Sequence, residues 1–230
     1  MAEIQGGKSP SLDMTPMVDL AFLLVTFFML TAQFKPQEVV MVDTPTSVTT
    51  KEIPENDLFI VTIDSTGNVF FSMENPKQAG QVVDLRGKML EFFAGKKQIS
   101  LSNQQKAKFS KEGMFGAPAS KLGDYLNASG EQKKELIKDN GGIPYDSTNN
   151  ELFIWIQAIQ TVHYQAKQEQ KENIQAGIVY KPKEVMQKLK YAIKADGNAN
   201  YEKVQKVISV FQDPQLHINS FSLITDMEKF

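Results

Sequence analysis

The chain combines one long apolar run with a remainder of mixed hydrophobic and polar pattern. The run, residues 14–34, is MTPMVDLAFLLVTFFMLTAQF and contains no Lys or Arg and a single acid, Asp19. At 1.5 Å per residue, a helix over this run is roughly 32 Å long, enough to cross the hydrocarbon core of a bilayer. No later segment is comparable, since LFIWIQAI at 152–159 is far too short. The pattern therefore predicts one transmembrane helix.

A cleaved signal peptide is the alternative interpretation of this run. The preceding residues carry Lys8 but also Glu3 and Asp13, so they lack the net positive charge of a signal peptide. Residues 30–32, Leu-Thr-Ala, make a poor cleavage site. We therefore favour a membrane anchor. Its orientation stays open, because Lys8 and Lys35 flank the run on both sides.

The segments on either side of the anchor are polar. Residues 1–13 form a short tail, and residues 35–56 carry three prolines with several Thr and Ser, a composition typical of an extended linker. Within this linker, residues 39–42 are Val-Val-Met-Val. These four either add as a strand to a sheet edge or lie on the surface of the domain, and the sequence does not decide between the two.

A folded region begins at residue 57. Two short β-rich runs, 58–63 and 69–73, flank the turn sequence DSTGN and predict a hairpin. A helix is expected next, because Val82, Leu85, Met89 and Phe93 have helical spacing, and Gly95 is the expected C-terminal stop.

The middle of the chain, residues 96–150, is polar and has few apolar positions. We expect one short helix over 130–142, closed by Asn-Gly-Gly, and otherwise loop or a mobile insertion. Residues 151–172 turn helical again, with Leu152, Trp155, Ile156, Ile159 and His163 on one face. Core packing is the favoured role for Trp155, and a partner-binding face is the alternative.

The last fifty residues carry the clearest patterns. Residues 188–196 alternate, with Leu189, Tyr191 and Ile193 on one side and lysines on the other, which predicts a half-exposed strand. Asn200 is a good N-cap for a helix that ends at Asp213-Pro214, and residues 216–225 follow as a closing strand. The strand, helix and strand suggest a βαβ unit. We expect a small α+β domain built from residues 57–95 and 181–230, interrupted by a polar, partly helical insertion over 96–180.

Asp19 is the most unusual residue of the chain. A carboxylate facing lipid costs about 3 kcal/mol or more, so it faces a partner helix or a water path, or it is protonated. One helix cannot bury its own acid, which implies a dimer or a polytopic partner. The alternative is structural: Thr15 as N-cap and Pro16 at the first helical position would put Asp19 in the first turn, where an acid complements the helix dipole.

Three residues follow on the same helix face as Asp19. Leu23, Thr26 and Leu30 lie at i+4, i+7 and i+11, so a hydroxyl stands two turns from the carboxylate. A carboxylate followed by a hydroxyl suits a proton path. For Thr26, however, we favour a hydrogen bond to its own backbone, which is common for Thr in membrane helices.

Composition removes several other classes of function. A net charge of −2 without a basic block gives no case for nucleic acid, and the absence of cysteine excludes disulfides and thiolate metal sites. His163 and His217 are isolated, so satisfied core or surface histidines are favoured over ligands. No phosphate loop, nucleophile elbow or metal-ligand spacing is present, and we expect no enzyme and no cofactor. The lysines at 188, 190 and 194 are interpreted as a solvated surface, with peptidoglycan contact as a minor alternative.

Both ends of the chain resemble the ExbD/TolR family of biopolymer transport proteins. The residues that carry the resemblance are Thr15-Pro16-Met17-Val18-Asp19-Leu20 with Leu24 and Phe28-Met29, and then Tyr191-Ala192-Ile193-Lys194-Ala195-Asp196 with Tyr201 opening a helix. The resemblance covers about residues 12–73 and 187–226. It does not extend to Thr26, where the family has aliphatic residues, or to residues 96–180, which lack a counterpart in short members. Asp43-Thr44-Pro45 matches the family's Val-x-Leu-Pro only loosely.

The resemblance implies a subunit of a proton-driven motor in the bacterial inner membrane. Its tail would be cytoplasmic and its α+β domain periplasmic, and Asp19 would carry the protons. A pentameric ExbB/TolQ-like protein would surround two such helices, so that the chain is a homodimer in the complex, and a TonB- or TolA-like protein would receive the work. Two alternatives remain: a TolR-like role in envelope integrity, and a passive membrane-tethered binding domain in which Asp19 caps its helix.

Overall fold

The structure is a computed structural model with two compact units, residues 1–35 and residues 36–230, and each is described by itself. It describes residues 14–31, 42–43, 46–47, 57–78, 81–181, 184–224 and 226–227.

The first unit contains helix α1 (Thr15–Thr31), which is 17 residues long. The carbonyl of Met14 accepts bonds from the amides of Met17 and Val18, both at 3.1 Å, so Met14 and not Thr15 precedes the helix. The prediction of Thr15 as N-cap is therefore wrong by one position. Among the described residues, none of the helices combines the length and hydropathy that crossing a bilayer demands. Residues 32–34 lie outside the described part, and the span over 14–34 stays a prediction.

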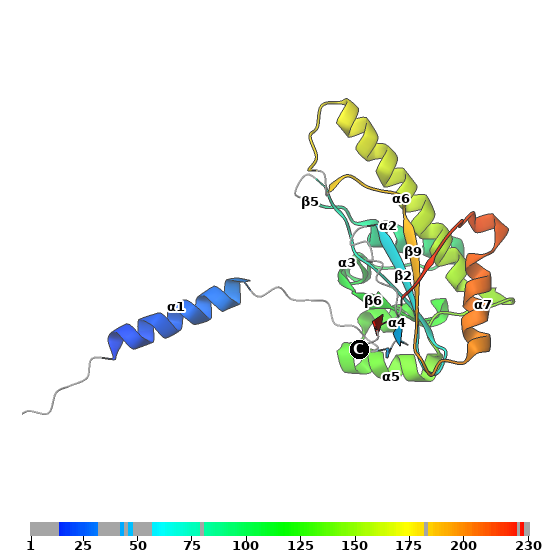
Figure 1. Cartoon of the computed structure of the whole chain (residues 1–230), viewed down its shortest axis with the longest axis horizontal. Coiled ribbons are helices and arrows are strands. Elements are labelled where there is room, and N and C mark those ends of the chain that lie inside the picture. Colours follow the sequence, from blue (N-terminus) through cyan, green and yellow to red (C-terminus); the bar gives the residue numbers. More distant parts are fainter. Residues whose placement is uncertain are drawn as a thin grey trace, which may run out of the picture. The chain divides into compact units, whose positions relative to one another are not determined.

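A five-stranded mixed sheet forms the centre of the second unit, in the order β10-β9-β2-β3-β6. Its strands are β2 (Leu58–Ile63), β3 (Val69–Met73), β6 (Met114–Phe115), β9 (Lys190–Ala195) and β10 (Ser222–Ile224). β2 and β3 are antiparallel, which confirms the predicted hairpin. β9 lies parallel to both β2 and β10, so segments far apart in the sequence lie side by side in Figure 1.

The predicted βαβ unit is present at the C-terminal end. Helix α7 (Tyr201–Phe211) connects β9 to β10, and the Asn200 side chain caps it by accepting the amide of Glu202 at 2.9 Å. Strand β9 lies in the interior of the sheet, between β10 and β2, and Ala192 on its lysine-bearing side is fully buried. One detail of the prediction is wrong. The closing strand is only β10, because Leu216 belongs to the 3-10 helix η3 (Pro214–Leu216).

The first helix of the domain, α2 (Leu85–Lys97), differs from its prediction at both ends. The Asp84 carboxylate accepts the amide of Gly87 at 2.8 Å and caps the start, whereas Val82 lies in the short strand β5. The helix continues through Gly95, and Gln98 takes the left-handed conformation at its end, with φ 56°. The expected stop at Gly95 is therefore wrong, because a different residue provides the positive φ.

The expectation of loop over most of residues 96–150 is also wrong. The region contains α3 (Asn103–Lys111), η1 (Ala119–Lys121), α4 (Leu122–Asn127), the predicted helix α5 (Gly130–Asn140) and strand β6 of the central sheet. Its apolar residues are few, but most of the large ones are buried, namely Phe109, Met114, Phe115, Leu122, Tyr125, Leu126, Ile137 and Ile143. A sparse set of large side chains thus suffices to fix the region to the core. Whether it is an insertion relative to its relatives stays a prediction.

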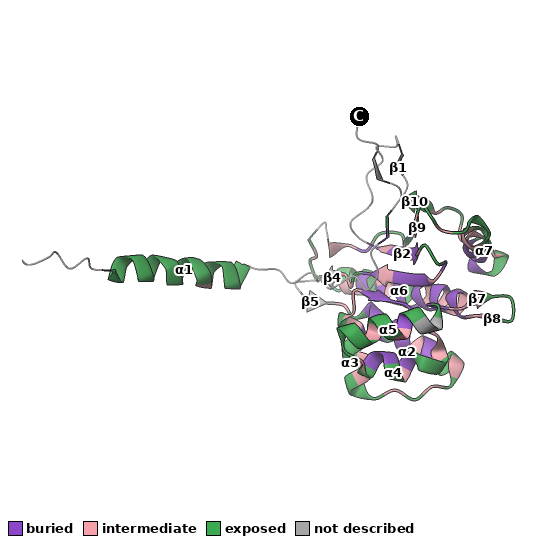
Figure 2. Ribbon diagram, turned by 90° about the horizontal axis from the view of Figure 1, so that it is seen from below, coloured by how far each residue is buried: buried purple, intermediate pink, exposed green. Residues whose placement is uncertain are grey.

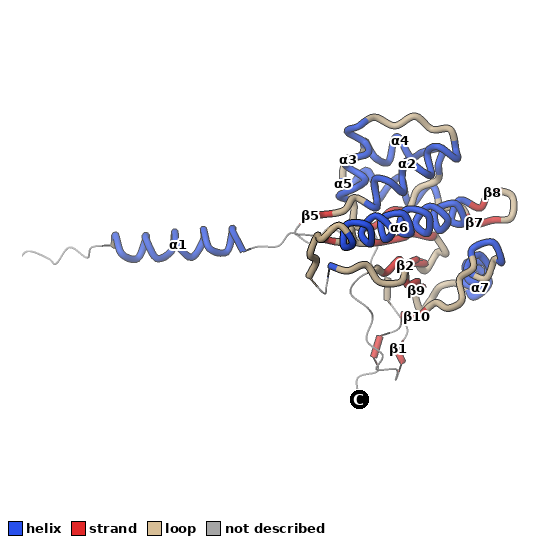
Figure 3. Tube along the Cα trace, turned by 90° about the horizontal axis from the view of Figure 1, so that it is seen from above, coloured by secondary structure: helices blue, strands red, loops and turns tan. Residues whose placement is uncertain are grey.

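Helix α6 (Glu151–Gln175) is the longest helix in the described residues, with 25 residues, and it confirms the helix predicted from residue 151. Trp155 is fully buried, as the core interpretation predicted, and its ring stacks on that of Phe93 with centroids 3.9 Å apart and planes at 8°. Phe71, Phe109 and Phe115 complete this aromatic cluster. In Figure 3, α2 to α5 lie on one side of the sheet, and Figure 2 shows buried residues within these helices.

Three pairs of two-residue strands complete the domain. They are β1 (Thr46–Ser47) with β11 (Asp226–Met227), β4 (Lys77–Gln78) with β5 (Gln81–Val82), and β7 (Tyr145–Asp146) with β8 (Asn149–Asn150). The β1–β11 pair joins the linker to the C-terminal end of the chain. Of the apolar run predicted either to add to a sheet edge or to lie on the surface, residues 39–41 fall outside the described part, and Val42 is buried without forming a strand.

Candidate functional site

Helix α1 is apolar on every side. Its side chains include Leu20, Phe22 and Leu30, which are exposed by 65%, 69% and 87%, and it contains no buried residue. Asp19 is its only ionisable residue. Among the described residues, the Asp19 carboxylate makes no hydrogen bond or ion pair. A helix that is apolar on all sides is stable in apolar surroundings. An ionised carboxylate in such surroundings costs free energy unless a partner group pairs with it.

The structure changes the argument about helix capping. No acidic residue lies in the first turn of α1, so Asp19 falls in the second turn. The favourable interaction between an acid and the helix dipole decays within the first turn, which weakens the capping explanation for Asp19. Thr15 and Pro16 occupy that first turn, where a proline is tolerated because its missing amide has no partner in the helix.

Thr26 behaves as the backbone interpretation predicted. Its hydroxyl donates to the carbonyl of Leu23 at 2.9 Å, within its own helix. Thr31 does the same toward Phe27 at 2.8 Å. Such bonds satisfy a hydroxyl in apolar surroundings without a partner helix. Asp19 is therefore the polar group of this face that the helix itself does not satisfy.

In the second unit, the described residues show two attachments at the ends of strand β9, besides the pairing of the linker strand β1 with β11. At Asp43, its amide donates to the Asp196 carboxylate at 3.2 Å, and its carbonyl accepts the amide of Gly197 at 2.9 Å, just beyond the end of β9. At Asp57, the carbonyl accepts the amide of Lys190 at 2.8 Å, where β9 begins. The two attachments thus lie at opposite ends of one strand.

Asp57 and His163 form a buried pair that sequence reasoning missed. The Asp57 carboxylate lies 3.1 Å from Nε2 of His163 on α6, and the exposed fractions of the two side chains are 3% and 6%. The other carboxylate oxygen accepts the amide of Gln187 at 2.7 Å. His163 is thus a satisfied core histidine, as expected, while His217 is exposed. No local pattern of residues indicates this pair, because 106 residues separate its members.

Arg86 is the second buried ionisable group that sequence reasoning missed. Its guanidinium donates to the carbonyls of Met73, Phe109 and Gly113, at 2.8, 3.3 and 3.1 Å, and joins α2 to β3 and to the end of α3. Burial lowers the pKa of Arg86 to about 10, against the opposing effect of Glu112 and other nearby groups. A signal was present: Arg86 is the one arginine among 25 basic residues.

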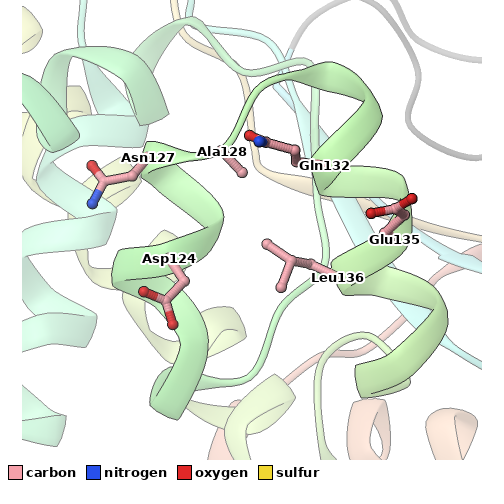
Figure 4. Close-up of a pocket in the computed structure, with 6 residues that line it drawn as sticks. All are labelled: Asp124, Asn127, Ala128, Gln132, Glu135 and Leu136. Carbon is pink, nitrogen blue, oxygen red and sulfur yellow. The ribbon is translucent and has the colours of Figure 1, made fainter.

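The remaining candidates carry little chemistry. No three potential ligands among the described His, Cys, Asp and Glu residues gather where they would hold a metal ion. A cavity of about 430 Å³ between α4 and α5 is lined by two carboxylates, two amides, Ala128 and Leu136 (Figure 4). Lys188 and Lys190 are exposed, as their alternation predicted, and Lys194 is half-buried.

Comparison with known proteins gives one clear result. The chain matches the family described as biopolymer transport protein ExbD/TolR over residues 7–226, which is nearly its whole length. Searches among characterised proteins and among solved structures found no significant match. The family match includes α1 with Asp19, the attachments at Asp43 and Asp57 and the whole sheet, and so joins the two ends at which the sequence already resembled that family. The chain therefore belongs to the ExbD/TolR family of biopolymer transport proteins.

Proposed function

We propose that the chain is the subunit of an inner-membrane motor that converts proton-motive force into mechanical work for TonB-dependent transport across the outer membrane. In this proposal α1 lies within a transmembrane helix over residues 14–34, Asp19 carries protons, and the α+β domain is periplasmic. Membership of the ExbD/TolR family supports the coarser statement, a biopolymer transport subunit that works with ExbB/TolQ and TonB/TolA partners in membrane complexes.

The single observation that carries the proposal is the position of Asp19. It is the one ionisable group on a helix whose apolar side chains are exposed on every side, and it lies beyond the first turn. A carboxylate in such surroundings is retained where it meets a partner or moves protons. An ExbB/TolQ-like protein around two copies of α1 would provide both the apolar surroundings and the partner groups.

The energetics are sufficient for mechanical work. One elementary charge that crosses 100 mV is worth about 2.3 kcal/mol, so a few protons could drive a rearrangement of packed helices. The work would reach the domain through the linker, which is bonded to the domain at Asp43 and Asp57. A TonB- or TolA-like protein would receive it there.

Asp19→Asn tests this proposal. The variant keeps the shape of the side chain but cannot ionise, so we expect energised transport to fall to background while the chain still co-purifies with its polytopic partner. The matched control is Thr26→Val, which removes a hydroxyl that bonds only within its own helix, and it should retain nearly full transport. Full transport by the Asp19→Asn variant would contradict the motor and favour a passive tether.

Two alternatives share the same family and layout. A TolR-like subunit would maintain envelope integrity, so Asp19→Asn would cause leakage of periplasmic proteins and leave nutrient uptake intact. A tethered binding domain, for peptidoglycan or a partner protein, would tolerate Asp19→Asn in both assays. Measuring uptake and leakage in the same strains therefore separates the three functions.

A further inference from the structure

The start of strand β2 is held more firmly than backbone pairing alone requires. Asp57, the residue before β2, places its carboxylate in the domain interior, although it directly follows the linker. Its two carboxylate oxygens and its carbonyl all accept bonds, from His163, Gln187 and Lys190. We call this arrangement of four residues the linker anchor.

The anchor joins three elements that are distant in sequence. His163 belongs to α6, Gln187 to the segment that leads into β9, and Lys190 to β9 itself. Gln170 lies seven residues after His163 on α6, which is about two helical turns along the same face. Its side-chain nitrogen donates to the carbonyl of Glu184 at 2.8 Å, and its side-chain oxygen accepts the amide of Met186 at 2.8 Å. The long helix is thus bonded to the start of β2 and to the segment before β9 through buried polar side chains.

The backbone at Asp57 also indicates a specific fit. Its φ is 54°, in the left-handed region that only glycine adopts freely and that aspartate tolerates better than most residues. Such a conformation persists where surrounding contacts hold it in place. Here the three accepted bonds do so, and they turn the chain sharply at the point where the linker meets the sheet.

We propose that Asp57 and His163 anchor the linker mechanically, so that tension on the linker passes into helix α6 and moves the domain as one body. Without the carboxylate, a pull at the start of β2 would peel its pairing with β9 one residue at a time, from Leu58↔Lys190 onward. With the carboxylate, bonds to α6 and to the segment before β9 share the load and must break together. The inference rests on the proposed function in one respect, namely that the linker is pulled.

The attachment at Asp43 makes a useful contrast. Among the described residues, Asp43 makes two backbone hydrogen bonds to the domain and is itself exposed, whereas the side chains of the Asp57–His163 pair are almost fully buried. Water competes for exposed hydrogen bonds and shortens their lifetime under load. Under tension, we therefore expect the bonds at Asp43 to break before those at Asp57, so that Asp57 transmits the force to the domain.

The decisive variant is Asp57→Gly in the full-length chain within its membrane complex. Glycine accepts the positive φ without strain, so the change removes the carboxylate and spares the turn. Hydrogen exchange followed by mass spectrometry should show the amides of residues 184–190 exchanging roughly tenfold faster or more, because Gln187 loses its acceptor. Energised transport should fall at least tenfold, while the fluorescence of Trp155, the single tryptophan, reports an intact core.

Two further variants separate anchoring from general stability. Asp57→Asn can still accept the amide of Gln187 and donate to the ring of His163, so it should restore slow exchange and most of the transport. Asp213→Gly makes the same chemical change at a carboxylate that caps η3, and it should leave both measurements unchanged. If Asp57→Gly does not fold, His163→Phe removes the bond from the α6 side and is assessed by the same two measurements.

The outcomes are distinct. Unchanged exchange over 184–190 in Asp57→Gly would overturn the anchor, and so would faster exchange with wild-type transport. Failure of the proposed function has a separate signature, full transport by Asp19→Asn, and the exchange measurement does not depend on it.

Discussion

Helix α1 and the α+β domain contain the same kinds of apolar side chain but differ in how far these side chains are buried. Phe22 and Leu30 of α1 are exposed by 69% and 87%, whereas Phe59, Phe71 and Trp155 of the domain are fully buried. The domain closes its own core with a sheet and helices from all parts of residues 57–224. In the proposed function, lipid or a partner helix covers the apolar surface of α1.

Ionisable groups follow the same division. In the domain, buried Arg86 has three carbonyl acceptors, and Asp57 has His163 and an amide as donors. Asp19 of α1 has no comparable set of partners among the described residues. The difference teaches that the domain provides partners for its own buried ionisable groups, whereas the proposed function requires other molecules to do so for Asp19.

The largest effect on the free energy of unfolding is expected from removing the Trp155 ring from the aromatic cluster. Trp155→Phe keeps most of the contacts and Trp155→Ala removes them, so the alanine variant should lower the free energy of unfolding of the domain by about 3–5 kcal/mol. Phe22→Ala, the matched change in α1, should leave that free energy unchanged because Phe22 belongs to the other compact unit. Urea unfolding followed by circular dichroism measures both, and equal losses would contradict the division of the chain into two units.

A smaller loss of unfolding free energy is expected when the single arginine, Arg86, is replaced by lysine. Arg86→Lys keeps the charge but replaces a planar fork by one ammonium group, which cannot reach the carbonyls of Met73, Phe109 and Gly113 together. Leaving a buried carbonyl without a donor costs about 1–3 kcal/mol, so we expect a loss of about 2–3 kcal/mol in urea unfolding. The control is the reverse exchange, Lys88→Arg, at an exposed position of α2, which should leave the free energy of unfolding unchanged.

The smallest effect is a dependence on alkaline pH. Burial raises the pKa of Tyr191 to about 12, against a hydrogen bond with Gln160 that lowers it, and the same residue titrates near 10 when unfolded. The neutral side chain therefore stabilises the domain fully below pH 10, and this contribution is lost as the pH rises through 12. By pH 11 the loss is about 1 kcal/mol.

Tyr191→Phe tests this sign directly. The variant cannot ionise at this position, so its free energy of unfolding should fall less than that of the wild type between pH 9 and pH 11, as followed by Trp155 fluorescence. Parallel curves for the two proteins would contradict the burial argument. Helix α1 contains no tyrosine, and its retention in membranes should not change over this range.

The elements that the sequence predicted well have strong local signals. The hairpin over 58–63 and 69–73, the helix capped by Asn200 and the helix that begins at residue 151 each combine a hydrophobic period with turn or capping residues. Asp19 was visible for the same reason, since a lone acid in an apolar run is a local anomaly. Residues 103–127 lack such a signal, because their anchoring side chains are too sparse to show a period.

What the sequence by itself determined, then, is the division of the chain, the type of its strongest elements and the residue on which the proposed motor depends. Tertiary structure alone decided that β9 is an interior strand, that Arg86 joins three elements and that Asp57 meets His163. The physical reason is distance along the chain. Periodicity and capping act over a few residues, whereas these contacts join segments up to 133 residues apart, as in the bond from Lys190 to Asp57, and no local pattern records them.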